Sequence, residues 1–251
     1  MPRGTQPHLL LLAWLLFVCT LAFGLYLAND QGLIAALFAA DQSKLSIAVA
    51  LVFGLGCLHC AARIITLSTQ VEQVNEALDG IRAEDIRIET DGFSLPPGRV
   101  LPEGPVADFL NDLCHYSRRI PDSLETEGDI SDLTDIFADK LKRSHEYGWY
   151  AVDILVKLGL LGTIIGFILM LGSIAETSTL DVNTMQKVLT QMSRGMGTAL
   201  YTTLAGLTAS ILLGAQYLMA DKGADALMER VLKFAHLSLT PAMRRADPVP
   251  V

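Results

Sequence analysis

Two apolar stretches late in the chain carry more threonine and glycine than a lipid-facing helix requires. They are LGLLGTIIGFILMLGSIAE at 158–176 and GMGTALYTTLAGLTASILLGAQYLMA at 195–220. A threonine hydroxyl can donate a hydrogen bond to a carboxylate, and its oxygen can help to coordinate a cation. Glycine lets a neighbouring backbone approach closely. These residue types favour either a close-packed helix pair or a wall that offers hydroxyls to an approaching group.

The second stretch has small or hydroxyl-bearing residues almost all round its first half. One face of the expected helix carries Ala199, Thr203, Gly206 and Ser210. Tight packing explains the glycines and alanines, but it explains several hydroxyls on one helix less well. We therefore expect a group to approach this face closely and to find hydroxyl partners there.

The first stretch allows close approach at its glycines. Gly159, Gly162 and Gly166 recur at helical spacing, and the last two form a GxxxG pair, a common packing motif. Thr163 lies between them. A lone threonine in a membrane helix usually bonds to a carbonyl of its own helix, so this residue alone indicates no site.

The composition is that of a membrane protein. Of the 251 residues 51% are hydrophobic, the mean hydropathy is +0.40, and the formal net charge of −8 comes from charges gathered in a few segments. A membrane crossing needs about 20 apolar residues. Four runs qualify, so the sequence predicts an all-α membrane protein with spans at about 9–28, 45–62, 154–176 and 195–220. The first run is too long for a signal peptide and is expected to be retained.

The distribution of lysine and arginine predicts the orientation. The chain has 19 basic residues, and 16 of them lie at Arg3, in the segment 63–157 or in the segment that begins at Lys222. The segments 29–44 and 177–194 together hold the other three. Basic residues favour the cytoplasmic side of a membrane. We therefore expect both termini and the region 63–150 in the cytoplasm.

The charges and the apolar runs divide the chain into four predicted parts. These are a first transmembrane hairpin at 1–62, a cytoplasmic helical region at 63–150, a second transmembrane hairpin at 151–220, and a cytoplasmic C-terminal helix and tail at 221–251. Two spans are expected to extend into the cytoplasm as long helices, one beyond Arg63 and one from about Ser131 to Glu176. Prolines in 89–104 predict a connecting loop.

The extension beyond Arg63 has an apolar stripe. Its members recur at spacings of three and four and are Ile64, Leu67, Val71, Val74, Leu78 and Ile81. Such a stripe must be covered by another element. The sequence leaves open whether the cover comes from the same chain or from a neighbouring subunit.

The second span contains Cys57-Leu58-His59-Cys60, residue types that can bind zinc or carry out redox chemistry. The two other cysteines are isolated, and the histidine does not follow the second cysteine as haem attachment requires. We interpret the cluster as ordinary helix residues. The sequence has no paired acids, no serine and histidine arrangement and no zinc spacing, so we expect neither an enzyme nor a cofactor. It also lacks the basic tract with interleaved aromatics that indicates nucleic-acid binding.

At GLLGTIIGFI and ALYTTLAGL the sequence resembles the MotA/TolQ/ExbB family of ion-channel motor subunits, whose patterns are GLLGT-x-x-G and A-L-x-x-T-x-x-G-L. The resemblance covers 158–220. It implies a homopentamer around a dimer of single-span partners of the ExbD, TolR or MotB kind in a bacterial inner membrane. Such complexes convert proton or sodium flow into mechanical work, by relative rotation of the two parts.

The resemblance assigns Thr163 and Thr203 to the ion pathway, at similar depth on antiparallel helices. The residues expected to pack the helices or form the pore wall are Gly159, Gly162, Gly166, Thr198, Ala199, Thr202, Gly206 and Ser210. Two features depart from the TolQ/ExbB pattern: Thr198 stands where that branch has glutamate, and the proline before GLLGT is missing. Four spans make the layout closer to MotA and to the ZorA defence motor.

Neither motif-bearing span has a carboxylate in its interior. A charge in mid-membrane is costly and generally functional, so we expect the titrating group to be an aspartate of the partner. A non-conducting membrane scaffold would also explain the glycine faces and the amphipathic extensions. The sequence leaves this alternative open, together with the choice between H⁺ and Na⁺.

Overall fold

The structure is a computed structural model that describes residues 7–82, 84–89, 92–96, 99, 101, 104–119, 127–175 and 182–246. Its helices are α1 (Pro7–Asp30), α2 (Leu33–Ala40), α3 (Leu45–Leu78), α4 (Pro105–Arg119), α5 (Glu127–Ala175), α6 (Val182–Phe234), the π-helix η2 (Ala235–Leu239) and α7 (Thr240–Ala246). Two short strands, β1 (Arg87–Glu89) and β2 (Gly92–Ser94), pair antiparallel with Ile88 opposite Phe93.

Among the residues that the structure describes, four helices are long and apolar enough to cross a membrane. Their candidate spans are Leu10–Asp30, Leu45–Leu78, His145–Gly172 and Thr184–Met243. This confirms the predicted all-α class with four spans, and the chain is a multi-pass membrane protein. The strand pair occupies part of the segment that was expected to be a loop. The predicted helix end at Glu176 and the tail beyond residue 246 lie outside the described residues.

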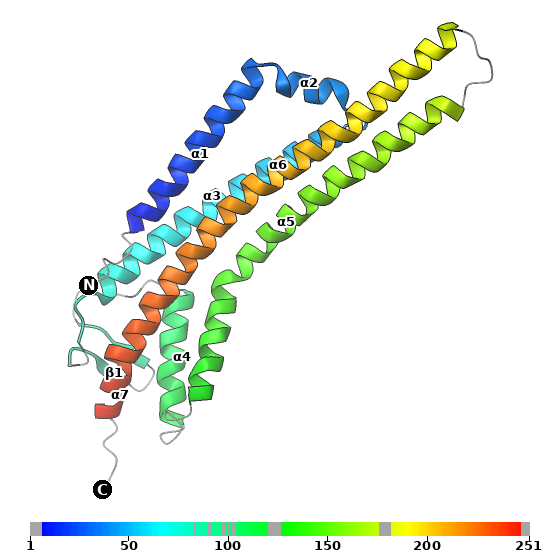
Figure 1. The fold of residues 1–251 in the computed structure, drawn as a ribbon. Helices are drawn as coiled ribbons and strands as arrows, with labels where there is room; N and C mark the ends of the chain where they lie inside the picture. Colours follow the sequence, from blue (N-terminus) through cyan, green and yellow to red (C-terminus); the bar gives the residue numbers. More distant parts are fainter. Residues whose placement is uncertain are drawn as a thin grey trace. The chain divides into compact units, whose positions relative to one another are not determined.

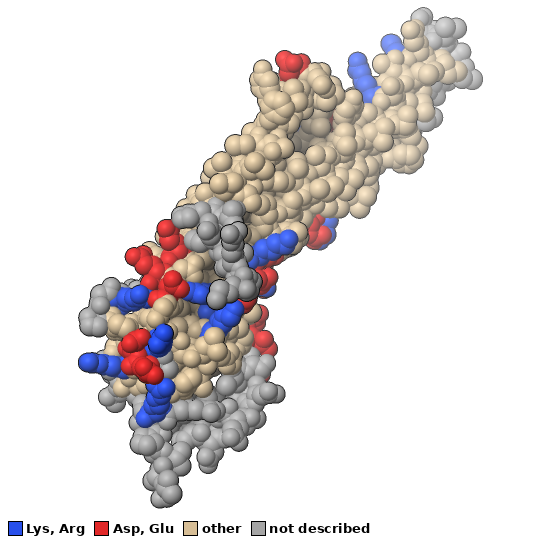
Figure 2. All heavy atoms as spheres, turned by 60° about the vertical axis from the view of Figure 1, so that its left-hand side comes forward, with Lys and Arg blue, Asp and Glu red and all other residues tan. Residues whose placement is uncertain are grey.

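The chain divides into two compact units, which are described separately. Unit 1 comprises 1–11, 63–145 and 220–251, and unit 2 comprises 12–62 and 146–219. In Figure 2 the charged side chains gather over unit 1, whereas the visible surface of unit 2 is largely uncharged. Within unit 2, the parts of α5 and α6 lie side by side and run in opposite directions (Figure 1).

The core of unit 1 is a hydrophobic cluster to which α3, α4, α5 and α6 contribute. The rings of Phe109 and Phe137 stack with centroids 4.5 Å apart. Members of the α3 stripe, among them Leu67, Val74 and Leu78, belong to this cluster. The stripe is therefore covered by the chain itself, which answers the question that the sequence left open.

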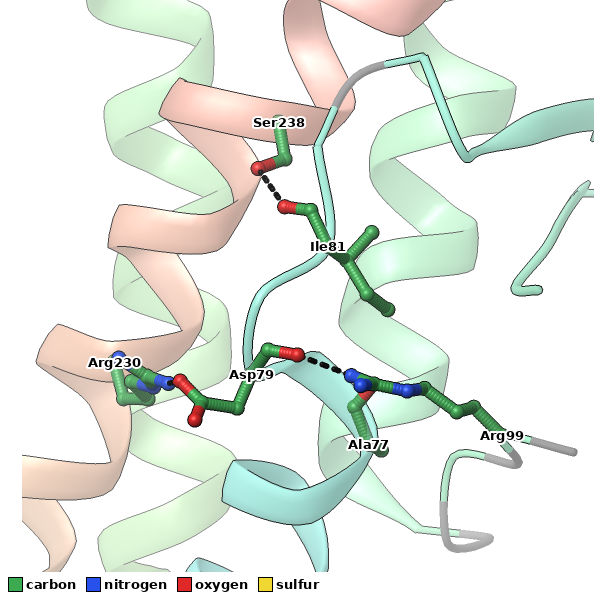
Figure 3. A network of polar contacts seen from close by, with 6 residues as sticks. All are labelled: Ala77, Asp79, Ile81, Arg99, Arg230 and Ser238. Atoms are coloured by element: carbon green, nitrogen blue, oxygen red, sulfur yellow. Dashed lines mark hydrogen bonds and ion pairs between the residues drawn. The ribbon is translucent and has the colours of Figure 1, made fainter.

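The end of α3 is stabilised by polar contacts within unit 1 (Figure 3). Arg99 donates hydrogen bonds to the carbonyls of Asp79 and Ala77, and Ser238 donates one to the carbonyl of Ile81 at 3.1 Å. The carboxylate of Asp79 also accepts a hydrogen bond from Arg230 at 2.9 Å. The last carbonyls of a helix have no partner within it, so the bond from Arg99 satisfies the carbonyl of Ala77, and the other contacts stabilise the chain just after the helix.

A salt bridge and a hydrogen bond of a histidine join α5 to α6 in unit 1. Lys142 Nζ lies 2.7 Å from Asp225 Oδ1, and His145 Nδ1 lies 2.6 Å from Asp221 Oδ1. The hydrogen bond to Asp225 raises the pKa of Lys142 above its ordinary value. Lys142 is almost half exposed, so water screens this pair and its contribution to stability is small.

The cluster of unit 1 predicts the effect of a core substitution. Leu227 is fully buried, and replacing it by alanine should cost about 2–5 kcal/mol because the helices cannot close over the cavity. Cys114, buried in the same cluster, reports its opening. In a protein whose other cysteines are replaced by alanine, we expect Leu227→Ala to speed maleimide labelling of Cys114 by more than about tenfold.

Leu237→Ala is the matched control, because Leu237 is 69% exposed. Its labelling rate should equal that of the parent protein. Equal rates for Leu227→Ala and Leu237→Ala would mean that Leu227 does not hold the cluster together.

Candidate functional site

The parts of α5 and α6 in unit 2 touch through their backbones. A Cβ atom at Gly206 would lie 2.6 Å from the carbonyl oxygen of Leu155 and 2.8 Å from the Cα of Gly159. A Cβ at Gly166 would lie 2.6 Å from the amide nitrogen of Ala199 and from the carbonyl oxygen of Gly195. Both distances are shorter than any side chain allows, so only glycine permits this contact.

Thr202 fills the space between these two contacts. Its side chain is fully buried, and its Oγ1 lies 2.1 Å from the position that a Cβ at Gly162 would take. The hydroxyl donates to carbonyls of its own helix, at 2.8 Å to Thr198 and 3.2 Å to Ala199. Thr202 thus packs into the notch left by Gly162 and presents no polar atom to a ligand.

Thr203, next in sequence, bonds across the helix pair. Its hydroxyl lies 3.0 Å from the carbonyl oxygen of Gly159 on α5 and 3.0 Å from that of Ala199 on α6. A hydroxyl has one proton and two lone pairs. The proton of Thr203 therefore has two equivalent acceptors, and the side chain is only partly buried.

Thr163 donates to the carbonyl oxygen of Leu160 on its own helix, at 2.5 Å. It follows Gly159, the residue bonded to Thr203, by one helical turn, or about 6 Å along the axis. Both threonines are partly exposed at similar levels of the hairpin. Their assignment to an ion pathway stays a prediction.

Thr198 faces another neighbour. It is fully buried and donates to the carbonyl of Ala40 at 2.7 Å, and it accepts a hydrogen bond from the amide of Gln42 at 3.3 Å. It thereby ties the connection between α2 and α3 to α6. Ser210, farther along α6, is also buried. Most residues that were expected to pack the helices or form the pore wall lie together at the contact of α5 with α6, namely Gly159, Gly162, Gly166, Ala199, Thr202 and Gly206. Thr198 instead bonds to Ala40, which precedes the connection between α2 and α3.

Asp41 in this connection was missed by the sequence analysis. Its carboxylate accepts hydrogen bonds from the amide of Ser46 at 2.7 Å and from the hydroxyl of Ser43 at 2.6 Å. Burial raises the pKa of Asp41, but the hydrogen bonds from Ser43 and Ser46 outweigh it, so the pKa lies below its ordinary value. An aspartate just before an apolar helical run is a capping signal, which could have identified it.

Polar side chains also join α3 to α6. His59 Nδ1 lies 2.7 Å from Tyr217 Oη, and Gln216 donates to Cys57 Sγ at 3.2 Å. The Cys57–Cys60 segment therefore holds two helices together. Among the described residues, no group of three His, Cys, Asp or Glu side chains is placed to hold a metal ion.

The backbone contact of α5 and α6 predicts that Gly206→Ala lowers stability. The added methyl group would meet the backbone of α5, and overpacking of this kind costs about 1–3 kcal/mol. We expect the variant to lose its folded, monodisperse state in detergent at a lower temperature than the parent protein. Gly172→Ala on α5 is the control, because a Cβ there meets no atom within 4 Å.

Alanine is preferred to glycine inside a helix by roughly 0.5–1 kcal/mol, so Gly172→Ala should be as stable as the parent or more so. Equal stability of the two variants would show that the helices are not in backbone contact at Gly206.

Part of the chain matches a known protein family. Residues 123–232 match the sequence profile of the MotA/TolQ/ExbB proton channel family. This segment contains both predicted pathway threonines and the whole α5–α6 contact. No curated protein and no solved structure matches the chain.

Proposed function

Since residues 123–232 match the MotA/TolQ/ExbB proton channel family, we propose that this chain is the ion-conducting subunit of a membrane motor. Five copies surround two single-span partner subunits, and the assembly converts ion-motive force into mechanical work. The family is one of membrane channels and not of enzymes. Both termini and unit 1 lie on the cytoplasmic side of a bacterial inner membrane, as the distribution of basic residues favours.

The observation that carries this proposal is the bond of Thr203 to Gly159 across two helices in backbone contact. Such a pair is rigid, and it holds the hydroxyl at a partly exposed edge. Neither 158–175 nor 195–220 contains an acid. The nearby Asp153 is more than half exposed and is paired with Lys157 on its own helix. The group that changes charge is therefore an aspartate of the partner subunit.

Thr203 can respond to both states of that aspartate. A protonated carboxyl donates its proton to a lone pair of Thr203 Oγ1, and the bond to Gly159 or Ala199 remains. An ionised carboxylate instead attracts the hydroxyl proton away from both carbonyls. The lost neutral bond is worth about 0.5–1.5 kcal/mol, and the charge-assisted bond that replaces it is roughly twice as strong.

We call the partly exposed side of the α5–α6 pair that carries Thr163 and Thr203 the threonine edge. Each change of protonation therefore alters how strongly the partner aspartate binds the threonine edge of one subunit. In a ring of identical subunits, this difference moves the partner from one copy to the next. The hydroxyl oxygens could equally contribute to the coordination of Na⁺, so the threonines do not by themselves select the ion. The family description favours H⁺.

A non-conducting scaffold is the second candidate function. It is favoured by the bonds that Thr163, Thr202 and Thr203 already make to helix carbonyls. Hydroxyls satisfied in this way also suit a helix pair that serves only to assemble a complex.

Ion flux through the reconstituted complex separates the two functions. The chain is co-expressed with a single-span subunit that carries a membrane aspartate, and acidification of the proteoliposome lumen is followed under an imposed potential. Thr203→Val keeps the side-chain shape and removes the hydroxyl. We expect it to reduce flux by about tenfold, which corresponds to the ~1.4 kcal/mol of one lost hydrogen bond. Repeating the assay in Na⁺ without a pH gradient identifies the ion.

Thr208→Val is the matched control, since Thr208 is an exposed residue of the same helix. Its flux should equal that of the parent protein. Normal flux through Thr203→Val would remove Thr203 from the mechanism, and absence of flux with every partner would favour the scaffold. Native mass spectrometry of the complex checks the ratio of five to two.

A further inference from the structure

Four polar side chains meet where α3 packs against α6 in unit 2. They are Cys57 and His59 on α3 and Gln216 and Tyr217 on α6. Gln216 and Tyr217 are each 1% exposed, although both helices are apolar enough to cross a membrane. Polar and ionisable groups are costly in such surroundings and usually have a function.

The hydroxyl of Tyr217 has two acceptors within reach. His59 Nδ1 lies 2.7 Å from Oη, and the carbonyl oxygen of Gly56 lies 3.3 Å from it. A phenol has one proton to donate and can also accept. Two arrangements are therefore possible: Tyr217 donates to His59, or Tyr217 donates to Gly56 and accepts a hydrogen bond from His59.

These two arrangements match the two protonation states of an imidazole. When His59 is neutral and Nδ1 carries no proton, Tyr217 donates to it. When His59 is cationic, Nδ1–H donates to Oη, and the hydroxyl turns to the carbonyl of Gly56. The added proton stays on Nδ1, and Tyr217 keeps its own proton throughout. Nδ1 of His59 and the hydroxyl of Tyr217 thus keep a hydrogen bond in both protonation states.

We propose that His59 and Tyr217 form a proton-binding site of this chain. It is distinct from the threonine edge, which lies on the α5 side of α6. The proton adds a charge-assisted hydrogen bond, which is roughly twice as strong as a neutral one. Uptake of the proton therefore holds α3 more firmly against α6.

The surroundings of His59 fit this role. The thiols of Cys57 and Cys60 on α3 act electrostatically on Tyr217, and the next charge along α3 in sequence is Arg63. Gly148 of α5 fixes the phenol ring, since a Cβ there would lie 2.0 Å from two ring carbons. The ring is buried against Gly148, so reorientation of the hydroxyl alone is enough to change its acceptor.

Nitrogen NMR of the histidine rings tests the site directly. The full chain, labelled with ¹⁵N-histidine, is reconstituted in lipid bilayers and measured between about pH 5 and 8, where histidine titrates. His59→Gln identifies the signals of His59. We expect a non-protonated Nδ1 at the alkaline end and two protonated ring nitrogens at the acidic end.

Tyr217→Phe keeps the ring and removes the hydroxyl. The cation then loses its acceptor, so the cationic fraction of His59 at about pH 6 should fall several-fold. Tyr201→Phe makes the same change elsewhere on α6 and should leave that fraction unaltered. The proposal is overturned if His59 stays neutral over the whole range, or if it titrates identically in Tyr217→Phe and the parent. The measurement needs no partner and no flux, so it is independent of the proposed function.

Discussion

The backbone contact of α5 with α6 in unit 2 determines which residues the other positions of this hairpin can hold. At Gly166 and Gly206 any side chain would meet backbone atoms at 2.6 Å, so glycine is required. Because the two backbones touch, the carbonyl of Gly159 comes within hydrogen-bonding distance of a side chain on the other helix. Thr203 uses this carbonyl at 3.0 Å. A larger residue at any of these glycines would separate the helices and remove that bond.

Helix α6 has an unusual composition because it packs against more than one neighbour within unit 2. Its glycines and Thr202 pack against α5, Thr198 bonds to the connection after α2, and Gln216 and Tyr217 bond to α3. A helix that meets neighbours on several sides cannot carry large apolar residues all round. Small and hydroxyl-bearing residues allow the neighbours to approach closely on each side. A small side chain makes fewer apolar contacts than a large one, and the hydrogen bond of a hydroxyl compensates for part of this loss.

The sequence predicted the number of spans and the glycine face, because apolar length and helical spacing are local properties of the chain. The stripe at 64–81 was equally clear, but its partner was not, since periodicity describes one helix and not what covers it. The same limit applies to Thr198 and His59, whose partners Ala40 and Tyr217 are each 158 residues away in sequence. In the Cys57–Cys60 segment the cysteines drew attention to metals, whereas Cys57 and His59 both make contacts with α6. Strands of three residues, such as β1, are too short to produce a detectable pattern.

Thr202 and Thr203 show how one interface can both pack and present a hydroxyl. Successive helix residues point about 100° apart, so one of two neighbours can be fully buried while the other lies at the edge. Thr202 is the buried neighbour; it packs against Gly162, and its hydroxyl donates to a carbonyl of its own helix. Thr203 is the neighbour at the edge, where its hydroxyl has two acceptors at equal distance, the carbonyl oxygens of Gly159 and Ala199. A third acceptor that approaches this edge competes with both carbonyls for the one proton of Thr203, and if it takes that proton neither carbonyl keeps its hydrogen bond from this hydroxyl.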